Sequence, residues 1–249
     1  MIYWAFLFSL PIIYLLIMIP KIIHQTWKDE NLPESQKPHI DKVKSLNPDW
    51  EYRLWTDAQM LEFVESEFPD FLETYKNFPK NIMRADSFRY LIMYKIGGVY
   101  LDLDYEVLEP FDFGNAALVL PYNRQISNGD KYDGIGNCFF ASEPYHPFWK
   151  KAIEAMKKGL PKNLVYQHKR STLEEETTGP AFLSRVFHEN SFENMVNPDR
   201  MVYHPPTPKT KSEQATIEAN GISKGIHHCA GTWREAKGLK KILQKLKRR

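Results

Sequence analysis

The sequence predicts an α/β fold whose sheet begins with mainly parallel strands. In the first hundred residues, short apolar runs typical of strands alternate with longer segments of helical periodicity. This alternation is typical of a parallel sheet covered by helices. The chain has 249 residues, of which 43% are hydrophobic and 26% charged, enough to form one sizeable domain. We therefore expect a single α/β domain between two unusual chain ends.

Six segments carry this prediction, in the order strand, helix, strand, helix, helix, strand: 21–27, 34–46, 50–56, 58–68, 81–96 and 99–104. Asp57 is the expected N-cap of the second helix, and Asn81 that of the third. The pair Gly97-Gly98 marks the end of the third helix, because glycine readily ends helices.

The second half of the chain is less regular, and its predicted elements are shorter. Two apolar runs are predicted strands, two periodic segments are predicted helices, and a last short strand enters a proline-rich loop: 116–122, 137–142, 146–159, 178–190 and 201–208. The two cysteines, Cys138 and Cys229, are too few for a disulfide framework or a four-cysteine zinc site, so we expect both to be free.

The N-terminal segment 2–20 contains no charged residue and is close to the minimum length of a membrane-spanning helix. It has neither a basic start nor a small-residue cleavage site, so an uncleaved anchor is favoured over a signal peptide. The alternative is a buried apolar helix or hairpin broken at Pro11. We expect residues 1–20 to be a membrane anchor or membrane-embedded helix, followed by one domain over 21–236.

The C-terminal segment 237–249 carries seven basic residues and no acid, although the whole chain has a net charge of only +2. Four apolar residues in it follow helical spacing: Leu239, Ile242, Leu243 and Leu246. A basic amphipathic helix of this kind suits an anionic membrane surface. A disordered tail or a nucleic-acid contact are the alternatives. The remaining, mildly acidic body is not expected to bind nucleic acid.

The stretch GGVYLDLDYE (97–106) places acidic residues at the end of an apolar strand. Alternation along a strand directs Tyr100, Asp102 and Asp104 to one face and Leu103 to the other. Neighbouring carboxylates repel one another unless a cation lies between them, and oxygen ligands suit Mg²⁺ or Mn²⁺. The alternative is a solvated strand end. Glu106 shares the alternation, but no role is assigned to it.

Two further groups of residues accompany the acidic strand. Asp86 and Arg89 are three apart in a predicted helix and therefore share a face. They form either a surface ion pair or a site in which Asp86 binds sugar hydroxyls and Arg89 neutralises negative charge. The cluster HHCAGTW (227–233) contains either a core tryptophan with incidental histidines or one histidine that completes a metal site.

The motifs IPKIIHQTW, NPDWEYRLWTD, RADSFRYLIMYKIGGVYLDLDYE, TGPAFL and HHCAGTW stand in the order seen in glycosyltransferase family 32, which the chain resembles from about residue 19 to 235. The resemblance implies a GT-A, Rossmann-like fold with a nucleotide-sugar donor and Mn²⁺ or Mg²⁺. It also implies retention of the anomeric configuration.

The resemblance also implies residue roles. Asp104 would bind the metal directly, and Asp102 would serve the ribose and a metal-bound water. Tyr100 and Asp86 would line the donor pocket, with Arg89 near the donor sugar or phosphate.

Three residues outside the acidic strand complete the implied site. Trp27 would stack on the nucleobase, and Trp233 would approach the leaving phosphate. His228 is favoured over His227 as a metal ligand, because the spacing from His228 to Gly231 matches that of related retaining enzymes.

The function that the resemblance implies is metal-dependent, retaining transfer of a hexose to a glycan or lipid-linked acceptor. Mannose from GDP-mannose is the first expectation, and a UDP-hexose donor is the second. No residue stands out as a covalent nucleophile, so front-face attack by the acceptor hydroxyl is expected. The alternatives are a catalytically silent membrane-bound protein that binds nucleotide sugar or glycan, and a membrane scaffold. We expect membrane association, in the Golgi or endoplasmic reticulum of a eukaryote or on the cytoplasmic face of a bacterial inner membrane.

Overall fold

A computed structural model describes residues 18–124, 134–160 and 171–231. Most of the apolar segment 2–20 lies outside these residues, and so do Trp233 and the predicted helix 237–249. Residues 18–20, the described end of the apolar segment, are not helical. Within the described ranges, every helix is too short or too polar to cross a membrane.

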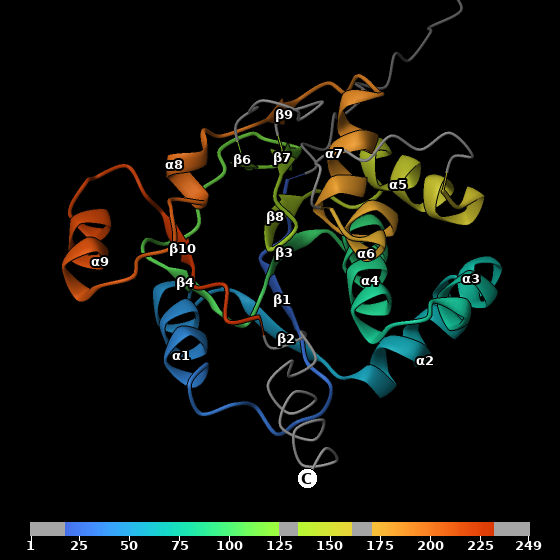
Figure 1. The fold of residues 1–249 in the computed structure, drawn as a ribbon, viewed down its shortest axis with the longest axis horizontal. Coiled ribbons are helices and arrows are strands. Elements are labelled where there is room, and N and C mark those ends of the chain that lie inside the picture. The colour runs from blue at the N-terminus through green and yellow to red at the C-terminus, as the bar shows by residue number, and fades with distance from the viewer. Residues whose placement is uncertain (1–17, 125–133, 161–170, 232–249) are drawn as a thin grey trace, which may run out of the picture.

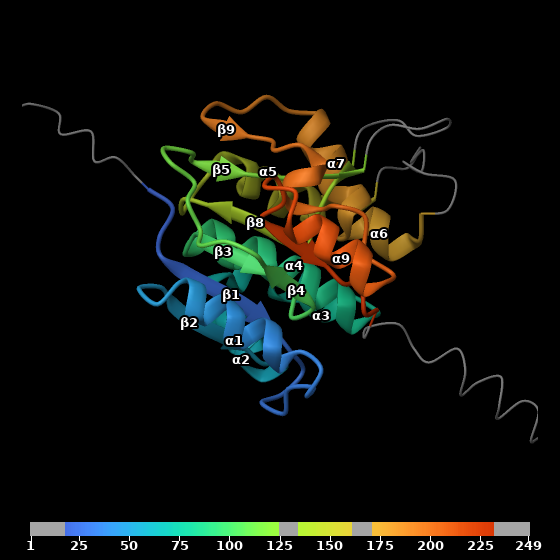
Figure 2. The same cartoon turned by 90° about the vertical axis from the view of Figure 1, so that its left-hand side faces the viewer.

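The central sheet has six strands in the order β2-β1-β3-β8-β5-β9, which Figure 2 shows side by side from β2 to β9. Their bounds are β1 (Ile22–Thr26), β2 (Glu51–Trp55), β3 (Gly98–Leu101), β5 (Leu118–Val119), β8 (Phe139–Ser142) and β9 (Met195–Val196). Strands β2, β1 and β3 are parallel, as predicted. Strand β8 is antiparallel to both β3 and β5, so the sheet as a whole is mixed.

Two small antiparallel sheets lie beside the central one. Strand β4 (Tyr105–Val107) pairs with β10 (Gly225–His227), and β6 (Tyr122–Arg124) pairs with β7 (Gly134–Ile135). The first pair joins two segments that are far apart in the chain. In its register, Tyr105 lies opposite His227.

The helices cover both faces of the central sheet (Figure 1). Helices α4, α5 and α7 lie on one side of the sheet, with α1 and α9 on the other. The helical bounds are α1 (Lys37–Leu46), α2 (Asp57–Glu67), the 3₁₀ helix η1 (Pro69–Phe71), α3 (Leu72–Asn77), α4 (Asn81–Lys95), α5 (Pro147–Lys158), α6 (Leu173–Thr177), α7 (Pro180–His188), α8 (Arg200–Tyr203) and α9 (Lys211–Glu218).

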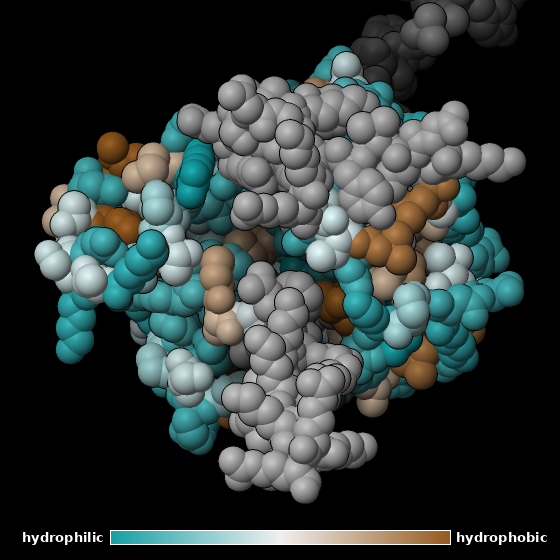
Figure 3. All heavy atoms as spheres, viewed as in Figure 1, coloured by the Kyte–Doolittle hydropathy of each residue, from teal (hydrophilic) through white to brown (hydrophobic). Residues whose placement is uncertain are grey.

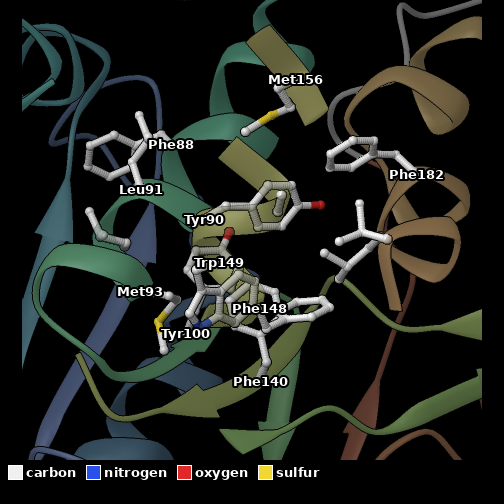
Figure 4. Packing of buried hydrophobic residues seen from close by; sticks show 14 of the residues in the cluster. Phe88, Tyr90, Leu91, Met93, Tyr100, Phe140, Phe148, Trp149, Met156 and Phe182 are labelled. Carbon is white, nitrogen blue, oxygen red and sulfur yellow. The ribbon is translucent and has the colours of Figure 1, made fainter. Parts of the chain in front are cut away.

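The sheet separates two hydrophobic clusters, as the alternation of side chains along a strand requires. Tyr100 of β3 and Phe140 of β8 belong to the cluster under α4 and α5, where Tyr90 and Trp149 stack (Figure 4). Phe139, the neighbour of Phe140, belongs to the cluster on the opposite face. On the face that Figure 3 shows, the described surface is mostly hydrophilic, with separate hydrophobic patches.

The glycines before β3 allow a close approach of three backbones. Gly97 and Gly98 have φ angles of +71° and +99°, which residues with a side chain rarely adopt. A Cβ atom at Gly98 would lie 2.5 Å from the carbonyl oxygen of Ile22 in β1. The glycine pair therefore ends α4 and also lets β3 pair with β1.

Several predicted boundaries differ from the structure. Thr56, not Asp57, is the N-cap of α2, because its hydroxyl accepts the Gln59 N–H in a capping box. Asn81 is the first residue of α4 and follows the N-cap Lys80.

Other differences concern whole elements. The predicted strand 201–208 begins instead as helix α8, capped by Asp199. Strand β3 ends at Leu101, because the chain turns there, with the Tyr105 N–H donating to the Asp102 carbonyl at 3.0 Å. The two aspartates therefore lie in a turn rather than on a strand. Helices α3, α6 and α9 and strands β4, β7, β9 and β10 were not predicted.

Candidate active site

A cavity of about 690 Å³ lies at the carboxyl ends of β1 and β3. Trp27, just after β1, lines it, and so do Asp102 and Asp104 in the turn after β3. Arg89 of α4 and His227 of β10 also reach its wall. Ligands of open α/β sheets bind beyond the carboxyl ends of the strands, so the fold places this cavity where a ligand is expected.

Arg89 is the buried centre of one side of the site. Its side chain is 5% exposed, and its Nη2 atom lies 3.0 Å from Oδ1 of Asp86. Its Nη1 atom lies 3.2 Å from Oδ1 of Asp102, and its guanidinium lies 4.6 Å from the Tyr100 ring centre. Asp86 and Arg89 share a helical face, as predicted, and form an ion pair, but this pair is buried and the alternative of a surface ion pair is wrong.

Asp86 anchors this arginine. Its carboxylate also accepts hydrogen bonds from the Asn137 amide and the Thr178 hydroxyl, both at 3.2 Å. Burial raises the pKa of Asp86 to about 7, although the Arg89 charge opposes this rise. The buried pair holds the guanidinium at a set position beside Asp102.

Asp102 and Asp104 each bind the protein through one oxygen and direct the other toward His227. Oδ1 of Asp102 accepts from the Tyr100 hydroxyl at 2.8 Å, whereas its Oδ2 lies 3.8 Å from Nε2 of His227. Oδ2 of Asp104 accepts from the Ala230 N–H at 2.7 Å, whereas its Oδ1 lies 3.2 Å from the same Nε2. Two carboxylate oxygens therefore converge on one imidazole nitrogen.

This arrangement fits a divalent cation. Two carboxylates and an imidazole are ligands that Mn²⁺ and related ions accept, and the cavity leaves room for water and phosphate oxygens. Burial opposes the charge of Asp104, but the hydrogen bonds from His227 and Ala230 outweigh it and lower the pKa of Asp104. Asp104 is therefore an anion, ready to bind a cation.

His228 lies in a different place from the one expected. Its Nε2 atom is 2.9 Å from Oε2 of Glu106, and its ring stacks on His39 with centroids 4.7 Å apart. The expectation that His228 joins the two aspartates is wrong, and His227 takes this place. Pairing of β10 with β4 explains the difference, since it brings His227 opposite Tyr105, next to Asp104.

Glu106, which had no predicted role, joins three elements. Its side chain is 9% exposed and accepts from Nζ of Lys42 in α1 at 2.7 Å. Its other oxygen forms a hydrogen bond with Nε2 of His228 and accepts one from the Gln214 amide of α9. The His228 and Lys42 contacts outweigh burial and lower the pKa of Glu106 to about 2. Glu106 thus ties the segment after β10 to the body of the domain.

The three predicted aromatic residues have different positions. Trp27 lines the cavity, and its indole N–H donates to the Asn31 carbonyl at 3.2 Å. Tyr100 is 1% exposed and supports Asp102 from behind the cavity wall, so it does not line the pocket as expected. Trp233 lies outside the described residues.

Three residues of the site escaped the sequence prediction: Asn137, Cys138 and Thr178. Asn137 and Cys138 belong to the predicted strand 137–142 but lie just before the observed start of β8, and a strand pattern does not mark them as site residues. Thr178 is the first residue of the quoted TGPAFL motif, and its place in that motif was the usable signal.

Comparisons with known proteins agree with this geometry. Residues 33–124 match the family model described as a glycosyltransferase sugar-binding region containing DXD motif. The chain is 36% identical over 174 residues to inositol phosphoceramide mannosyltransferase 1 of Schizosaccharomyces pombe, covering 68% of this chain and 51% of that protein. It is 42% identical over 141 residues to mannosyl phosphorylinositol ceramide synthase SUR1 of Saccharomyces cerevisiae, covering 56% and 35%.

A solved structure shares the fold. The structure titled PaToxG Glycosyltransferase matches with a TM-score of 0.51 and 17% identity, over 69% of each chain. The chain spans about half the length of the first curated relative. Both acidic residues of the matched DXD region, Asp102 and Asp104, stand at the cavity. The chain belongs to the DXD-containing glycosyltransferase family, which corresponds to glycosyltransferase family 32.

Proposed function

We propose that this chain is a metal-dependent glycosyltransferase of the GT-A fold that transfers mannose from a nucleotide sugar to a glycolipid. The main support is the convergence of one oxygen each of Asp102 and Asp104 on Nε2 of His227, at the carboxyl ends of β1 and β3. The two relatives with mannosyl transfer to inositol phosphoceramide in their names support mannose and a lipid acceptor.

The cavity suits a nucleotide sugar in size and in the chemistry of its walls. Its volume of about 690 Å³ is within the usual range of small-molecule sites, roughly 300–1,000 Å³. The indole of Trp27 in the cavity wall offers a flat surface for a nucleobase. The carboxylates and His227 in the same wall are the groups beside which a diphosphate would bind with its cation.

The cation, when bound, neutralises charge that develops on the leaving diphosphate. The protein's own residues prepare this position. Arg89 and Tyr100 hold Oδ1 of Asp102, so that Oδ2 faces the site. The Ala230 N–H holds Oδ2 of Asp104, so that Oδ1 faces it. Such fixed charges and dipoles stabilise a transition state without reorganisation.

The contacts of the two glutamates in the cavity wall, Glu174 and Glu175, support a retaining, front-face mechanism without a covalent nucleophile. A double-displacement reaction needs a free carboxylate close to the anomeric carbon. Glu174 forms an ion pair with Lys80, and Glu175 accepts the Thr172 N–H at 2.8 Å in a capping box. Both glutamates are thus engaged in structural contacts. The acceptor hydroxyl then attacks from the side of the leaving group, and the departing phosphate takes its proton.

A ceramide-based acceptor implies that the enzyme works at a membrane. The apolar segment 1–20 and the basic segment 237–249 are proposed to hold it there. In this arrangement the catalytic domain lies directly on the bilayer.

A donor screen tests the proposal. The protein is incubated with GDP-mannose and a panel of UDP-hexoses, with Mn²⁺ and inositol phosphoceramide vesicles, and released nucleotide is measured. We expect release of GDP and a product whose anomeric configuration, read by NMR, matches that of the donor. No nucleotide release with any donor would favour the silent binding protein instead.

Matched variants test the cation site. Asp104→Ala should lower turnover at least about 100-fold with Mn²⁺ in excess, because the ion loses a direct ligand. Asp49→Ala, at an exposed aspartate of the turn before β2, should leave turnover unchanged. Near-normal turnover of Asp104→Ala would refute the metal role.

A further inference from the structure

A buried thiol lies beside the two aspartates and His227. Cys138 is 5% exposed and lines the same cavity. One ligand atom each of Asp102, Cys138 and His227 lies within 4.8 Å of the others. Bonds to thiophilic ions are about 2.0–2.3 Å long, so ligands of one ion lie roughly 3–4.6 Å apart. The limit of 4.8 Å is just above this range, so a small adjustment of the side chains lets the sulfur bind the ion that the carboxylates and imidazole bind.

Burial raises the pKa of the Cys138 thiol, so a bound metal has to displace its proton, and a neighbouring imidazole is placed to support the sulfur once it does. Nδ1 of His204 lies 3.5 Å from Sγ of Cys138, and His204 is 5% exposed. In its neutral form this buried imidazole carries one N–H. Among the described residues, Nε2 of His204 has no hydrogen-bond partner. The tautomer with the proton on Nδ1 donates to the sulfur and avoids burying an unpaired N–H group.

Gly136 makes room for this histidine. A Cβ atom at position 136 would lie 2.4 Å from Nε2 of His204, closer than any real contact. A glycine two residues before Cys138 thus lets the imidazole pack directly behind the sulfur. Hydrogen bonds from an outer residue to a metal-bound ligand are a usual feature of metal sites.

We propose that Cys138 is a sulfur ligand of the cation site, so that Zn²⁺ or Cd²⁺ binds there through Asp102, Cys138 and His227 in preference to Mg²⁺. On binding, the S–H bond breaks, the metal–sulfur bond forms and the proton passes to solvent. An oxygen-only site would favour hard ions, whereas a thiolate and an imidazole favour Zn²⁺ and Cd²⁺. The inference rests on the cation site of the proposed function.

The test uses Cd²⁺ alone, with no sugar donor. Cd²⁺ is titrated into the metal-free protein, and the ultraviolet sulfur-to-cadmium charge-transfer band is recorded. We expect the band to saturate at one ion per chain. Cys138→Ser should abolish it, while circular dichroism shows the same fold.

The other cysteine supplies the matched control. The chain has only two cysteines, and Sγ of Cys229 lies 3.4 Å from the other ring nitrogen of His227. Cys229→Ser should keep the band. A band that survives in Cys138→Ser, or disappears only in Cys229→Ser, would overturn the proposal. A Cd²⁺ ion bound by the separate group His39, Glu106 and His228 would give no sulfur band.

A second variant addresses the possibility that Cys138→Ser fails to fold. His204→Ala removes only the partner of the sulfur, and we expect it to weaken Cd²⁺ binding about 10- to 100-fold while the band remains. Unchanged affinity would contradict the role of His204. Mn²⁺-dependent nucleotide release is measured separately. If the unaltered protein shows no band but normal release, the sulfur ligand alone is rejected. If it shows the band but no release, the transferase function alone is rejected.

Discussion

His24 makes a sharp prediction about stability in acid. It lies in β1 with no exposed surface, and its two ring nitrogens have different partners. Nε2 lies 2.9 Å from the Gly97 carbonyl and donates to it, whereas Nδ1 accepts the Trp55 indole N–H at 3.1 Å. Only the neutral imidazole satisfies both contacts. Protonation would place a second N–H against the indole donor.

The size of the effect follows from the pKa. Burial lowers the pKa of His24 from 6.5 to about 4, with the Gly97 hydrogen bond opposing. The folded state therefore binds fewer protons than the unfolded state between these values. The contribution to stability is complete above pH 6.5 and is lost as the pH falls toward 4. At 1.36 kcal/mol per unit, the loss is about 3 kcal/mol.

The assay compares His24→Gln with the unaltered chain. A glutamine does not titrate, so the difference in free energy of unfolding between the two proteins should shrink by about 3 kcal/mol from pH 7 to pH 4. Urea unfolding, followed by circular dichroism at several pH values, measures it. His188→Gln, at a partly exposed histidine of α7, serves as the control. A difference that stays constant within about 1 kcal/mol would refute the reasoning.

Two further substitutions test packing around the site. Gly98→Ala should lower the free energy of unfolding by about 3 kcal/mol, because its Cβ would lie 2.5 Å from the Ile22 carbonyl oxygen. Gly114→Ala, at a positive φ but with open space around it, should lower it by about 1 kcal/mol. Thermal unfolding compares them, and equal costs would contradict the steric argument. Glu106→Gln should lower the free energy of unfolding by about 2 kcal/mol at pH 7, because it removes the charge-assisted pair with Lys42. Glu62→Gln, at an exposed glutamate, should leave the free energy of unfolding almost unchanged. Equal urea midpoints for these two variants would show that the Glu106 contacts do not stabilise the fold.

Much of the fold could be predicted because its signals are local. Helix α4 is a long segment without internal glycine or proline, and Gly97-Gly98 ends it, so its prediction was accurate within a residue or two. Strands β1 and β2 are apolar or aromatic runs that lie within the predicted strands 21–27 and 50–56, and each is one residue shorter at both ends. Helix α9 was missed because it contains no buried residue, so its sequence carries no apolar stripe.

The candidate site was predicted in part. Asp86 and Arg89 share a helical face, and this spacing was enough to pair them. The sequence favoured His228, whereas the structure places His227 beside the two aspartates, because this position depends on the register of β10 against β4. No local pattern reports that register, since the two strands lie more than a hundred residues apart.

The sequence by itself determined the α/β class, the order of the first strands and helices, and the acidic pair at the end of β3. These properties depend on periodicity and spacing over a few residues. Only the tertiary structure decided which oxygens of Asp102 and Asp104 face the cavity, and that Glu106 joins α1 to the segment after β10. The contact of Asp104 with Ala230 spans 126 positions, and that of Glu106 with His228 spans 122. Contacts over such separations arise from the packing of the whole chain, and nearby residues do not specify them.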